Sequence, residues 1–337
     1  MSEIIGRLLA AGQRAEVFEW GTRVVKLSRS TGSKPVIFRE AAIHAAVEAL
    51  GLPVPSVWSV QQIDGRWGIV FDRVSGVSFA EQMRHDAAAI PRYLRILAHL
   101  HTRIHAHSAN EFSCLKIWLA TNIDRVIVLD DARKQILLNG LRGMPDGDRL
   151  CHGDFHPMNV LGEASQPIVI DWPNACRGDP AADVCRSYLI LRLHADEIAK
   201  PYLDAYCGVA SVRRETVLDW LPYFAAARLA DRCPRRATSL TRTHRDAVIR
   251  AVACSATLSL KGAKIIGCPA RGMLKNATSV YRPASASLRG AGAGFYRERV
   301  RQNGCQGRFR VTNRSAATTR ATNLPTQAAN GRCRQST

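Results

Sequence analysis

The sequence predicts an α+β chain with two lobes, a small β-rich N-terminal lobe and a larger, mostly helical C-terminal lobe. The first 72 residues alternate short strands with one helix, and helical spacing of apolar residues dominates later. Beyond residue 232 this periodicity is lost and the composition becomes strongly basic. We therefore expect lobes at residues 1–74 and 75–232, followed by a disordered basic tail at residues 233–337.

In the N-terminal lobe, the run Thr22–Leu27 predicts a strand that carries one inward lysine, Lys26. The alanine-rich stretch Glu40–Leu50 has apolar residues at helical spacing, and Gly51 marks its end. Glu40 lies three residues before the first apolar position, so it falls on the face of this helix that meets the sheet. A Lys–Glu contact is therefore expected between the strand and the helix.

Two further segments complete this lobe. Gly12 lies in a turn between two expected strands, where the backbone could cover a bound phosphate group. Trp67–Val74 predicts the last strand and the connector into the second lobe.

In the C-terminal lobe, Pro91–His107 predicts a core helix with leucines on one face. His101 and His105 lie four residues apart on it, as in some metal sites, but the sequence shows no acid or cysteine partner beside them. We therefore interpret them as histidines without a ligand role. Short strands are expected at Arg149–His152 and Asn159–Leu161, and further helices from about residue 181 and at residues 221–231.

The stretch Cys151–Asn159 is the most informative part of the chain. It places Asp154 and Asn159 five residues apart, and Asp171 follows directly after the apolar run at residues 167–170. Three oxygen-bearing side chains at this spacing suit phosphoryl transfer, in which one carboxylate orients a hydroxyl while an amide and a second carboxylate hold Mg²⁺. Each residue alone has an ordinary structural explanation, but their joint occurrence in this order favours the catalytic one.

Together, the Gly12 turn, Lys26, Glu40, His-Gly-Asp154-x4-Asn159 and Ile-Asp171-Trp resemble the aminoglycoside phosphotransferase family of small-molecule kinases. The resemblance implies a protein-kinase-like fold and ATP-dependent transfer of phosphate to a hydroxyl. It implies that Asp154 is catalytic, that Lys26, Glu40 and Gly12 serve nucleotide binding, and that Asn159 and Asp171 bind Mg²⁺.

The resemblance also implies roles for the flanking residues. His152 is expected to brace the catalytic loop, which is the stretch Cys151–Asn159. Asp179 and Asp183 are expected to secure that loop or to cap the following helix. His156 and Trp172 lie close enough in sequence to touch a substrate, and packing is an equal alternative.

The acceptor is expected to be a small hydroxylated molecule rather than a protein. Gly153 replaces the arginine that precedes the catalytic aspartate in protein kinases, and eleven residues between Asp171 and Asp183 are too few for an activation loop. The identity of the acceptor stays open between an aminoglycoside-type antibiotic, choline-like alcohols, amino-acid alcohols and sugars. An antibiotic acceptor would make this an antibiotic-resistance enzyme. A nucleotide-binding pseudokinase is the alternative from another class.

The basic charge of the chain belongs to its tail. Residues 1–232 hold 27 Lys and Arg against 26 Asp and Glu, whereas residues 233–337 hold 20 against 2. The tail shows no recognisable module and few aromatic residues, so we favour a shifted reading frame or a disordered segment over an arm that binds nucleic acid. An inactive kinase, the product of such a frameshift, is a further alternative to the active enzyme. A frameshift near residues 230–236 would replace the helices that end the lobe and leave the acceptor pocket unformed.

The remaining composition predicts a cytoplasmic protein with no membrane partner. The ten cysteines form neither a Cys-x-x-Cys pair nor a zinc spacing. The N-terminus lacks the pattern of a signal peptide, and no apolar run reaches the length of a membrane span. The oligomeric state and the preference for ATP over GTP are not predicted.

Overall fold

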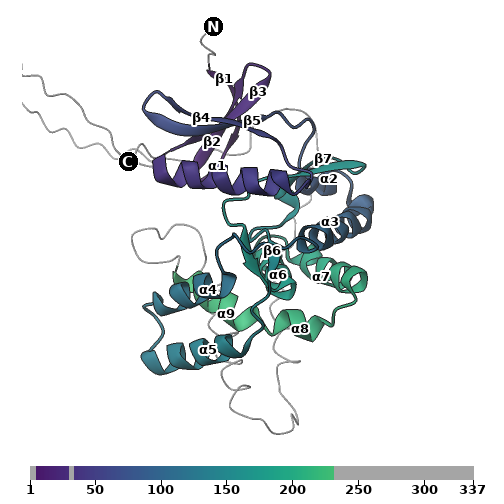
Figure 1. Cartoon of the computed structure of the whole chain (residues 1–337). Coiled ribbons are helices and arrows are strands. Elements are labelled where there is room, and N and C mark those ends of the chain that lie inside the picture. Colours follow the sequence, from purple (N-terminus) through teal and green to yellow (C-terminus); the bar gives the residue numbers. More distant parts are fainter. Residues whose placement is uncertain (1–4, 30–33, 231–337) are drawn as a thin grey trace, which may run out of the picture. The chain divides into compact units, whose positions relative to one another are not determined.

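The computed structural model describes residues 5–29 and 34–230, which fall within the first of two compact units, Met1–Ile266 (Figure 1). The basic tail, its expected disorder and the suspected change of reading frame lie outside the described residues. The boundary between lobes at residue 74 stays a prediction. The predicted order of a sheet lobe followed by a helical lobe is confirmed.

The described part of the N-terminal lobe is an antiparallel five-stranded sheet with the strand order β1-β2-β3-β5-β4. Its strands are β1 (Ile5–Ala11), β2 (Ala15–Trp20), β3 (Arg23–Ser28), β4 (Val57–Ile63) and β5 (Arg66–Asp72). Helix α1 (Lys34–Ala49) joins β3 to β4 and packs on one face of the sheet (Figure 1).

The alternation of side chains along β3 decides where Lys26 points. Val25 and Leu27 are buried with Trp20 on the sheet face away from α1. Lys26 lies between them in sequence, so its side chain leaves the opposite face, where Ile69 of β5 is its cross-strand neighbour. That face is the one covered by α1.

Helix α1 begins at Lys34, six residues earlier than the alanine-rich stretch indicated. Pro35 occupies its first turn, where a missing backbone N–H costs nothing and the fixed φ of proline suits a helix. Its end is as predicted, because Gly51 follows with a φ of 71°, in the left-handed region.

The C-terminal lobe consists mainly of helices (Figure 1). They are α2 (Phe79–His85), η1 (Ala87–Ala89), α3 (Ile90–His105), α4 (Leu115–Asp124), α5 (Asp131–Gly143), η2 (Pro157–Asn159), α6 (Pro180–His194), α7 (Asp196–Ala210), α8 (Arg214–Leu218) and α9 (Leu221–Ala230). Short strands form two pairs, β6 (Arg149–Cys151) with β9 (Cys176–Gly178), and β7 (Val160–Glu163) with β8 (Gln166–Val169). The helices expected near residues 91, 181 and 221 are present, while α4 and α5 were not anticipated.

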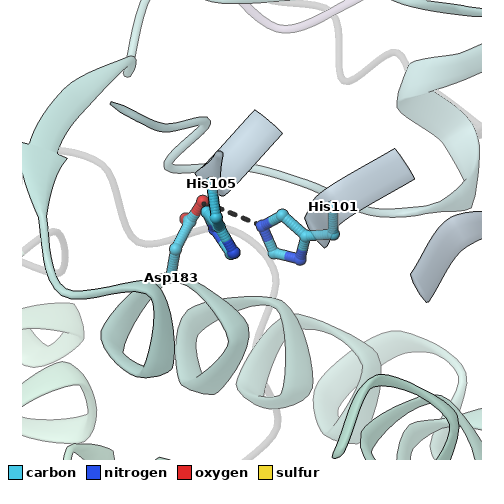
Figure 2. Close-up of side chains that lie close together, drawn as sticks. All are labelled: His101, His105 and Asp183. Atoms are coloured by element: carbon cyan, nitrogen blue, oxygen red, sulfur yellow. Dashed lines mark hydrogen bonds and ion pairs between the residues drawn. The ribbon is translucent and has the colours of Figure 1, made fainter. Parts of the chain in front are cut away.

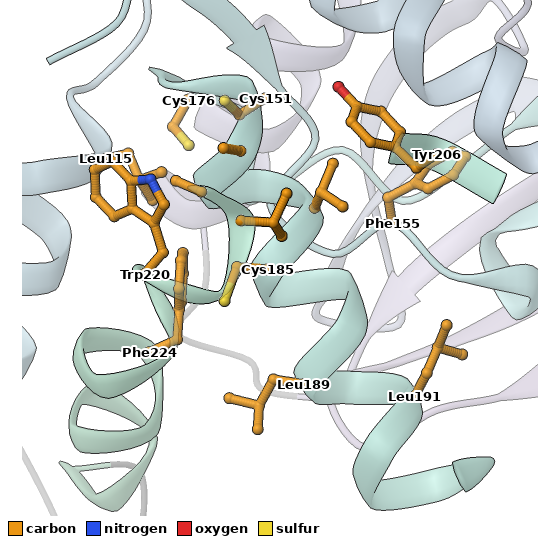
Figure 3. Packing of buried hydrophobic residues seen from close by; sticks show 14 of the residues in the cluster. Leu115, Cys151, Phe155, Cys176, Cys185, Leu189, Leu191, Tyr206, Trp220 and Phe224 are labelled. Atoms are coloured by element: carbon orange, nitrogen blue, oxygen red, sulfur yellow. The ribbon is translucent and has the colours of Figure 1, made fainter. Parts of the chain in front are cut away.

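The core of this lobe surrounds α6, as Figure 3 shows for part of it. Cys185 and Leu189 of α6 face Trp220 and Phe224, which belong to the segment around α9 (Figure 3). The five cysteines at positions 114, 151, 176, 185 and 207 are free thiols. Among the helices between residues 5 and 230, none has the length and apolar character needed to cross a bilayer.

Helix α3 offers a test of the core. Leu97 is completely buried on it, so Leu97→Ala should lower the free energy of unfolding by about 2–5 kcal/mol through lost burial and the cavity left behind. Urea denaturation followed by circular dichroism measures this change. Arg95→Ala on the exposed side of the same helix is the control and should change it by about 0.5 kcal/mol or less. Equal effects of both variants would contradict the assignment of the buried face.

Candidate active site

Lys26 joins two carboxylates that come from different lobes. Its Nζ lies 2.8 Å from Oε1 of Glu40 on α1 and 2.5 Å from Oδ1 of Asp171, which follows β8. The sequence predicted the contact with Glu40, and the contact with Asp171 is an additional one. Three of the predicted site residues are therefore brought together at one point between the sheet and the helical lobe.

The charges of this group stabilise one another. Burial alone would lower the pKa of Lys26, but Asp171 and then Glu40 outweigh it, so its pKa is raised. Burial alone would raise the pKa of Asp171, but the ammonium of Lys26 reverses the direction, so its pKa is lowered. Lys26 is therefore a cation and Asp171 an anion at neutral pH, as binding of phosphate and of a metal ion requires.

The segment between α1 and β4 fixes α1 relative to the second lobe. His44 of α1, which is buried, makes a 2.7 Å hydrogen bond from Nε2 to the carbonyl of Pro55. Two residues earlier, the carbonyl of Pro53 accepts a 2.7 Å hydrogen bond from the N–H of Val169, the last residue of β8. The helix that carries Glu40 and the strand that leads to Asp171 are thus held by the same short segment.

The catalytic loop requires glycine at position 153. The φ of Gly153 is 77°, and a Cβ there would lie 2.3 Å from the carbonyl oxygen of Asn174. No side chain fits into that distance, so the loop can pass this close to the segment after Asp171 only with glycine. The residue that distinguishes this loop from that of protein kinases is thus explained by a close backbone approach.

Asp154 and Asn159 lie in one tight loop. The Nδ2 group of Asn159 donates to the backbone carbonyl of Asp154 at 2.9 Å, and it also lies 3.3 Å from Nε2 of His156. The carboxylate of Asp154 is 30% exposed, and within residues 5–230 the nearest ionisable partner is His156, at 3.9 Å from Nε2 to Oδ2. The carboxylate of Asp154 is therefore available to a ligand.

His152 connects this loop to Asp171. Its Nε2 donates to the carbonyl of Ile170 at 3.1 Å, and its Nδ1 accepts from the N–H of Asp154 at 3.2 Å. Burial lowers the pKa of His152, so the neutral tautomer that these two bonds require is the stable one. The expected bracing role of His152 agrees with this geometry.

Trp172 packs instead of facing a ligand. It is 1% exposed, its indole N–H donates to the carbonyl of Val169, and its ring lies 4.4 Å from that of His152. The alternative that Trp172 contacts the substrate is therefore wrong.

Asp171, just before Trp172, has a φ of 67°, a conformation that is uncommon outside glycine and is often found at functional sites.

Asp183 secures the catalytic loop, which is one of the two roles expected of it from the sequence. It is buried on α6 and accepts hydrogen bonds from the backbone N–H groups of His152, at 2.7 Å, and Gly153, at 2.9 Å. It also contacts His101 and His105, as Figure 2 shows. The expectation that these histidines have no acid partner is wrong, because the partner lies about 80 positions further along the chain.

The donors at positions 159 and 171 suit magnesium. The amide nitrogen of Asn159 is engaged by Asp154, which leaves its carbonyl oxygen as the remaining ligand atom. Asp171 offers an ionised carboxylate. Two hard oxygen donors of this kind are typical of Mg²⁺ sites that take their other ligands from water and phosphate. Gly12 lies in the β1–β2 turn, where its N–H donates to the carbonyl of Ala15 at 2.8 Å.

The sequence pattern of the phosphotransferase enzyme family, APH, matches residues 6–221. The chain belongs to this family. Among proteins with curated descriptions, none matches the chain by sequence.

Solved structures support the fold of this phosphotransferase. A thermostable mutant of the aminoglycoside phosphotransferase APH(4)-Ia, in a ternary complex with ADP and hygromycin B, superposes with a TM-score of 0.55 at 16% identity, over 77% of this chain and 96% of the other. The choline kinase LicA from Streptococcus pneumoniae superposes with a TM-score of 0.53 at 13% identity, over 74% and 93%. At such identities the likeness concerns the fold, which is the two-lobed protein-kinase-like fold.

Sequence reasoning missed the residues behind the catalytic loop of this phosphotransferase. Tyr202 and Tyr206 of α7 bond to His101 and His105, respectively, through their hydroxyl groups. The signal was present, because both pairs have a spacing of four on otherwise apolar helix faces. Asp179 caps α6 by accepting from the N–H of Ala181, as expected.

The buried histidine His101 predicts acid sensitivity. Burial, and then the neighbouring His105, lower its pKa from 6.5 to about 3. Between those pH values the unfolded chain binds a proton at His101 that the folded protein does not, so stability is complete above pH 6.5 and falls as the pH decreases toward 3. The loss is about 1.4 kcal/mol per pH unit for this group.

Urea denaturation at a series of pH values from about 7 to about 4 measures this dependence. His101→Gln should reduce its slope because the titrating group is gone. His99→Gln, on the exposed side of the same helix, should leave the slope unchanged. Identical slopes for wild type and His101→Gln would contradict the pKa assignment.

Proposed function

We propose that the protein is an ATP-dependent kinase that transfers the γ-phosphate to a hydroxyl group of a small molecule. The observation that carries this proposal is the convergence of Lys26, Glu40 and Asp171 beside the loop that holds Asp154 and Asn159. A cation for phosphate, two oxygen ligands for a metal ion and an available carboxylate are the groups that phosphoryl transfer uses.

Asp154 is the proposed catalytic residue. Its carboxylate is partly exposed, and His156, at 3.9 Å, is its one ion-pair partner in the part of the chain that the structure describes, so it can accept a hydrogen bond from the attacking hydroxyl. The transition state of phosphoryl transfer is loose, so orientation of that hydroxyl matters more than strong basicity. The fixed backbone on both sides of Asp154 provides this orientation.

Lys26 is proposed to bind the nucleotide phosphates, with Glu40 holding its ammonium in place, and Gly12 to lie in the loop over them. Asn159 and Asp171 would hold Mg²⁺, which would neutralise charge on the phosphates. Lys26 already contacts Asp171. The phosphate-binding cation and the metal-binding carboxylate would therefore act on adjacent parts of one nucleotide.

The proposed acceptor is an aminoglycoside-type antibiotic or a related hydroxylated metabolite such as a choline-like alcohol. The structures of similar fold include an aminoglycoside phosphotransferase bound to hygromycin B and a choline kinase. Asp179 already caps α6 eight residues after Asp171, which leaves no room for a platform that would bind a protein. With an antibiotic acceptor the enzyme would confer resistance in the cytoplasm.

The deciding experiment is ATP-dependent phosphate transfer with the full chain, followed by mass spectrometry. Aminoglycosides, other hydroxylated antibiotics, choline-like alcohols and sugars form the acceptor panel. A product that gains one phosphate supports the proposal and identifies the acceptor class. Magnesium-dependent ATP binding without any product would favour a pseudokinase, or a kinase inactivated by a frameshift near residues 230–236.

Asp154→Asn keeps the shape of the side chain but removes its charge. We expect kcat to fall by about 100- to 10,000-fold while ATP binding stays close to that of the wild type, because the carboxylate acts on the acceptor hydroxyl. Steady-state kinetics with a calorimetric titration of ATP measures both. Asp148→Asn, an exposed position shortly before the loop, is the control. Undiminished turnover in Asp154→Asn would refute the assignment.

Asp171→Asn tests the metal site. Asparagine tolerates the positive φ at this position, so the variant removes charge without adding backbone strain. Magnesium-dependent ATP binding should weaken by at least about 10-fold, the loss typical of a damaged metal site. Calorimetric titrations with and without magnesium give this number. Asp64→Asn, which also has a positive φ and lies in an exposed turn, should bind like wild type; a matching loss there would point to backbone strain instead.

A further inference from the structure

A closed network of buried polar side chains lies behind the catalytic loop. It joins His101 and His105 of α3, Asp183 of α6, and Tyr202 and Tyr206 of α7 (Figure 2 shows the first three). All five side chains are buried, and none has a part in the proposed transfer itself. A buried polar network of this size is stable only if every member has its hydrogen-bond partners.

The pattern of donors and acceptors fixes the protonation of the network. Both oxygens of Asp183 accept backbone N–H groups, Oδ2 from His152 and Oδ1 from Gly153. Burial would raise the pKa of this carboxyl, but the attraction and hydrogen bonds of His101 and His105 hold it well below its usual value. Asp183 is therefore an anion that accepts hydrogen bonds and donates none.

The tautomers of the two histidines follow from this charge. Nε2 of His101 lies 2.9 Å from Oδ2 of Asp183, and Nε2 of His105 lies 3.3 Å from it, so each Nε2 must donate. Since His101 is neutral, its Nδ1 must accept, and the hydroxyl of Tyr202 donates to it at 2.6 Å. The hydroxyl of Tyr206 lies 2.8 Å from Nδ1 of His105 in the same arrangement.

We propose that His101, His105, Tyr202 and Tyr206 are positioning residues for phosphoryl transfer, acting through Asp183. The tyrosine hydroxyls select the Nε2–H tautomers, these tautomers orient the carboxylate of Asp183, and the carboxylate holds the N–H groups of His152 and Gly153. The backbone held in this way leads directly into Asp154. The catalytic effect rests on the proposed kinase function, whereas the effect on the loop backbone does not.

The geometry couples the loop to a remote helix. His101 with Tyr202 and His105 with Tyr206 form two equivalent bridges between α3 and α7, one helical turn apart. The contacts of the catalytic-loop backbone with Asp183 thus depend on the position of α7, although this helix comes later in the chain. A small displacement of α7 would be transmitted to Asp154 through hydrogen bonds alone.

The test compares two changes at His101 and one at its partner Tyr202. His101→Leu removes the donor, His101→Gln restores a side-chain N–H that can reach Asp183, and Tyr202→Phe removes the hydroxyl that selects the tautomer. His99→Leu, on the exposed side of α3, is the matched control. Hydrogen exchange of the backbone amides at residues 149–156 is read beside kcat and the KM for ATP.

We expect His101→Leu to speed exchange at His152 and Gly153 and to lower kcat by about 100-fold, the effect of a small misplacement of a catalytic group. The KM for ATP should stay within about twofold, since the nucleotide-binding groups are untouched. His101→Gln should recover most of both losses, and Tyr202→Phe should show a smaller loss of the same kind. His99→Leu should match wild type.

Unchanged exchange at residues 149–156 in both His101→Leu and Tyr202→Phe would overturn the proposal, as would a loss confined to the KM for ATP. If His101→Leu does not fold, Tyr202→Phe decides, because it removes a single hydroxyl. If the wild type transfers phosphate to no acceptor, the kinase function fails on its own. The exchange measurement would then still support or overturn the positioning of the loop.

Discussion

A buried, ionised carboxylate at position 183 is the constraint on which the catalytic half of the structure depends. A charge in the interior is stable only when hydrogen bonds replace the water it has lost. Asp183 meets this requirement with two backbone N–H groups and two imidazoles, which come from the catalytic loop and from α3. Satisfying this one charge therefore fixes the relative positions of α3, α6 and the loop, and through the tyrosines that of α7.

Lys26 is the charge that joins the two lobes, as Asp183 joins the elements around the catalytic loop. Its ammonium forms one ion pair on each side, with Glu40 on α1 and with Asp171 after β8. The segment between α1 and β4 adds hydrogen bonds to the same two elements. The two arrangements differ in one respect that matters for function. Asp183 is buried, whereas Lys26 and Asp171 remain partly exposed, and in the proposed function they would exchange their mutual contact for phosphate and a metal ion.

Local patterns predicted a good part of this site. The strand-forming run at Thr22–Leu27 and the helical period after Glu40 placed Lys26 and Glu40 on facing elements, and the kinase resemblance paired them. The spacing of Asp154, Asn159 and Asp171 indicated phosphoryl transfer. The start of α1 was missed because the residues before Glu40 lack the alanine-rich signal, although Pro35 marked it. The partner of His101 and His105 was missed because pairing across about 80 residues is set by the packing of helices, which no local period encodes.

Asp154 and Asp183 show how one residue type can have opposite tasks in one fold. The carboxylate of Asp183 has its hydrogen-bonding capacity filled by protein groups and so acts as a fixed part of the scaffold. The carboxylate of Asp154, two residues from a backbone N–H bound by Asp183, accepts no hydrogen bond from protein groups in the described ranges 5–29 and 34–230, and it is partly exposed. Gly153 lies between His152 and Asp154 in sequence, and its lack of a side chain lets the loop approach the carbonyl of Asn174. The carboxylate proposed to be catalytic is therefore held in place through its backbone, which leaves its oxygens available to the proposed acceptor.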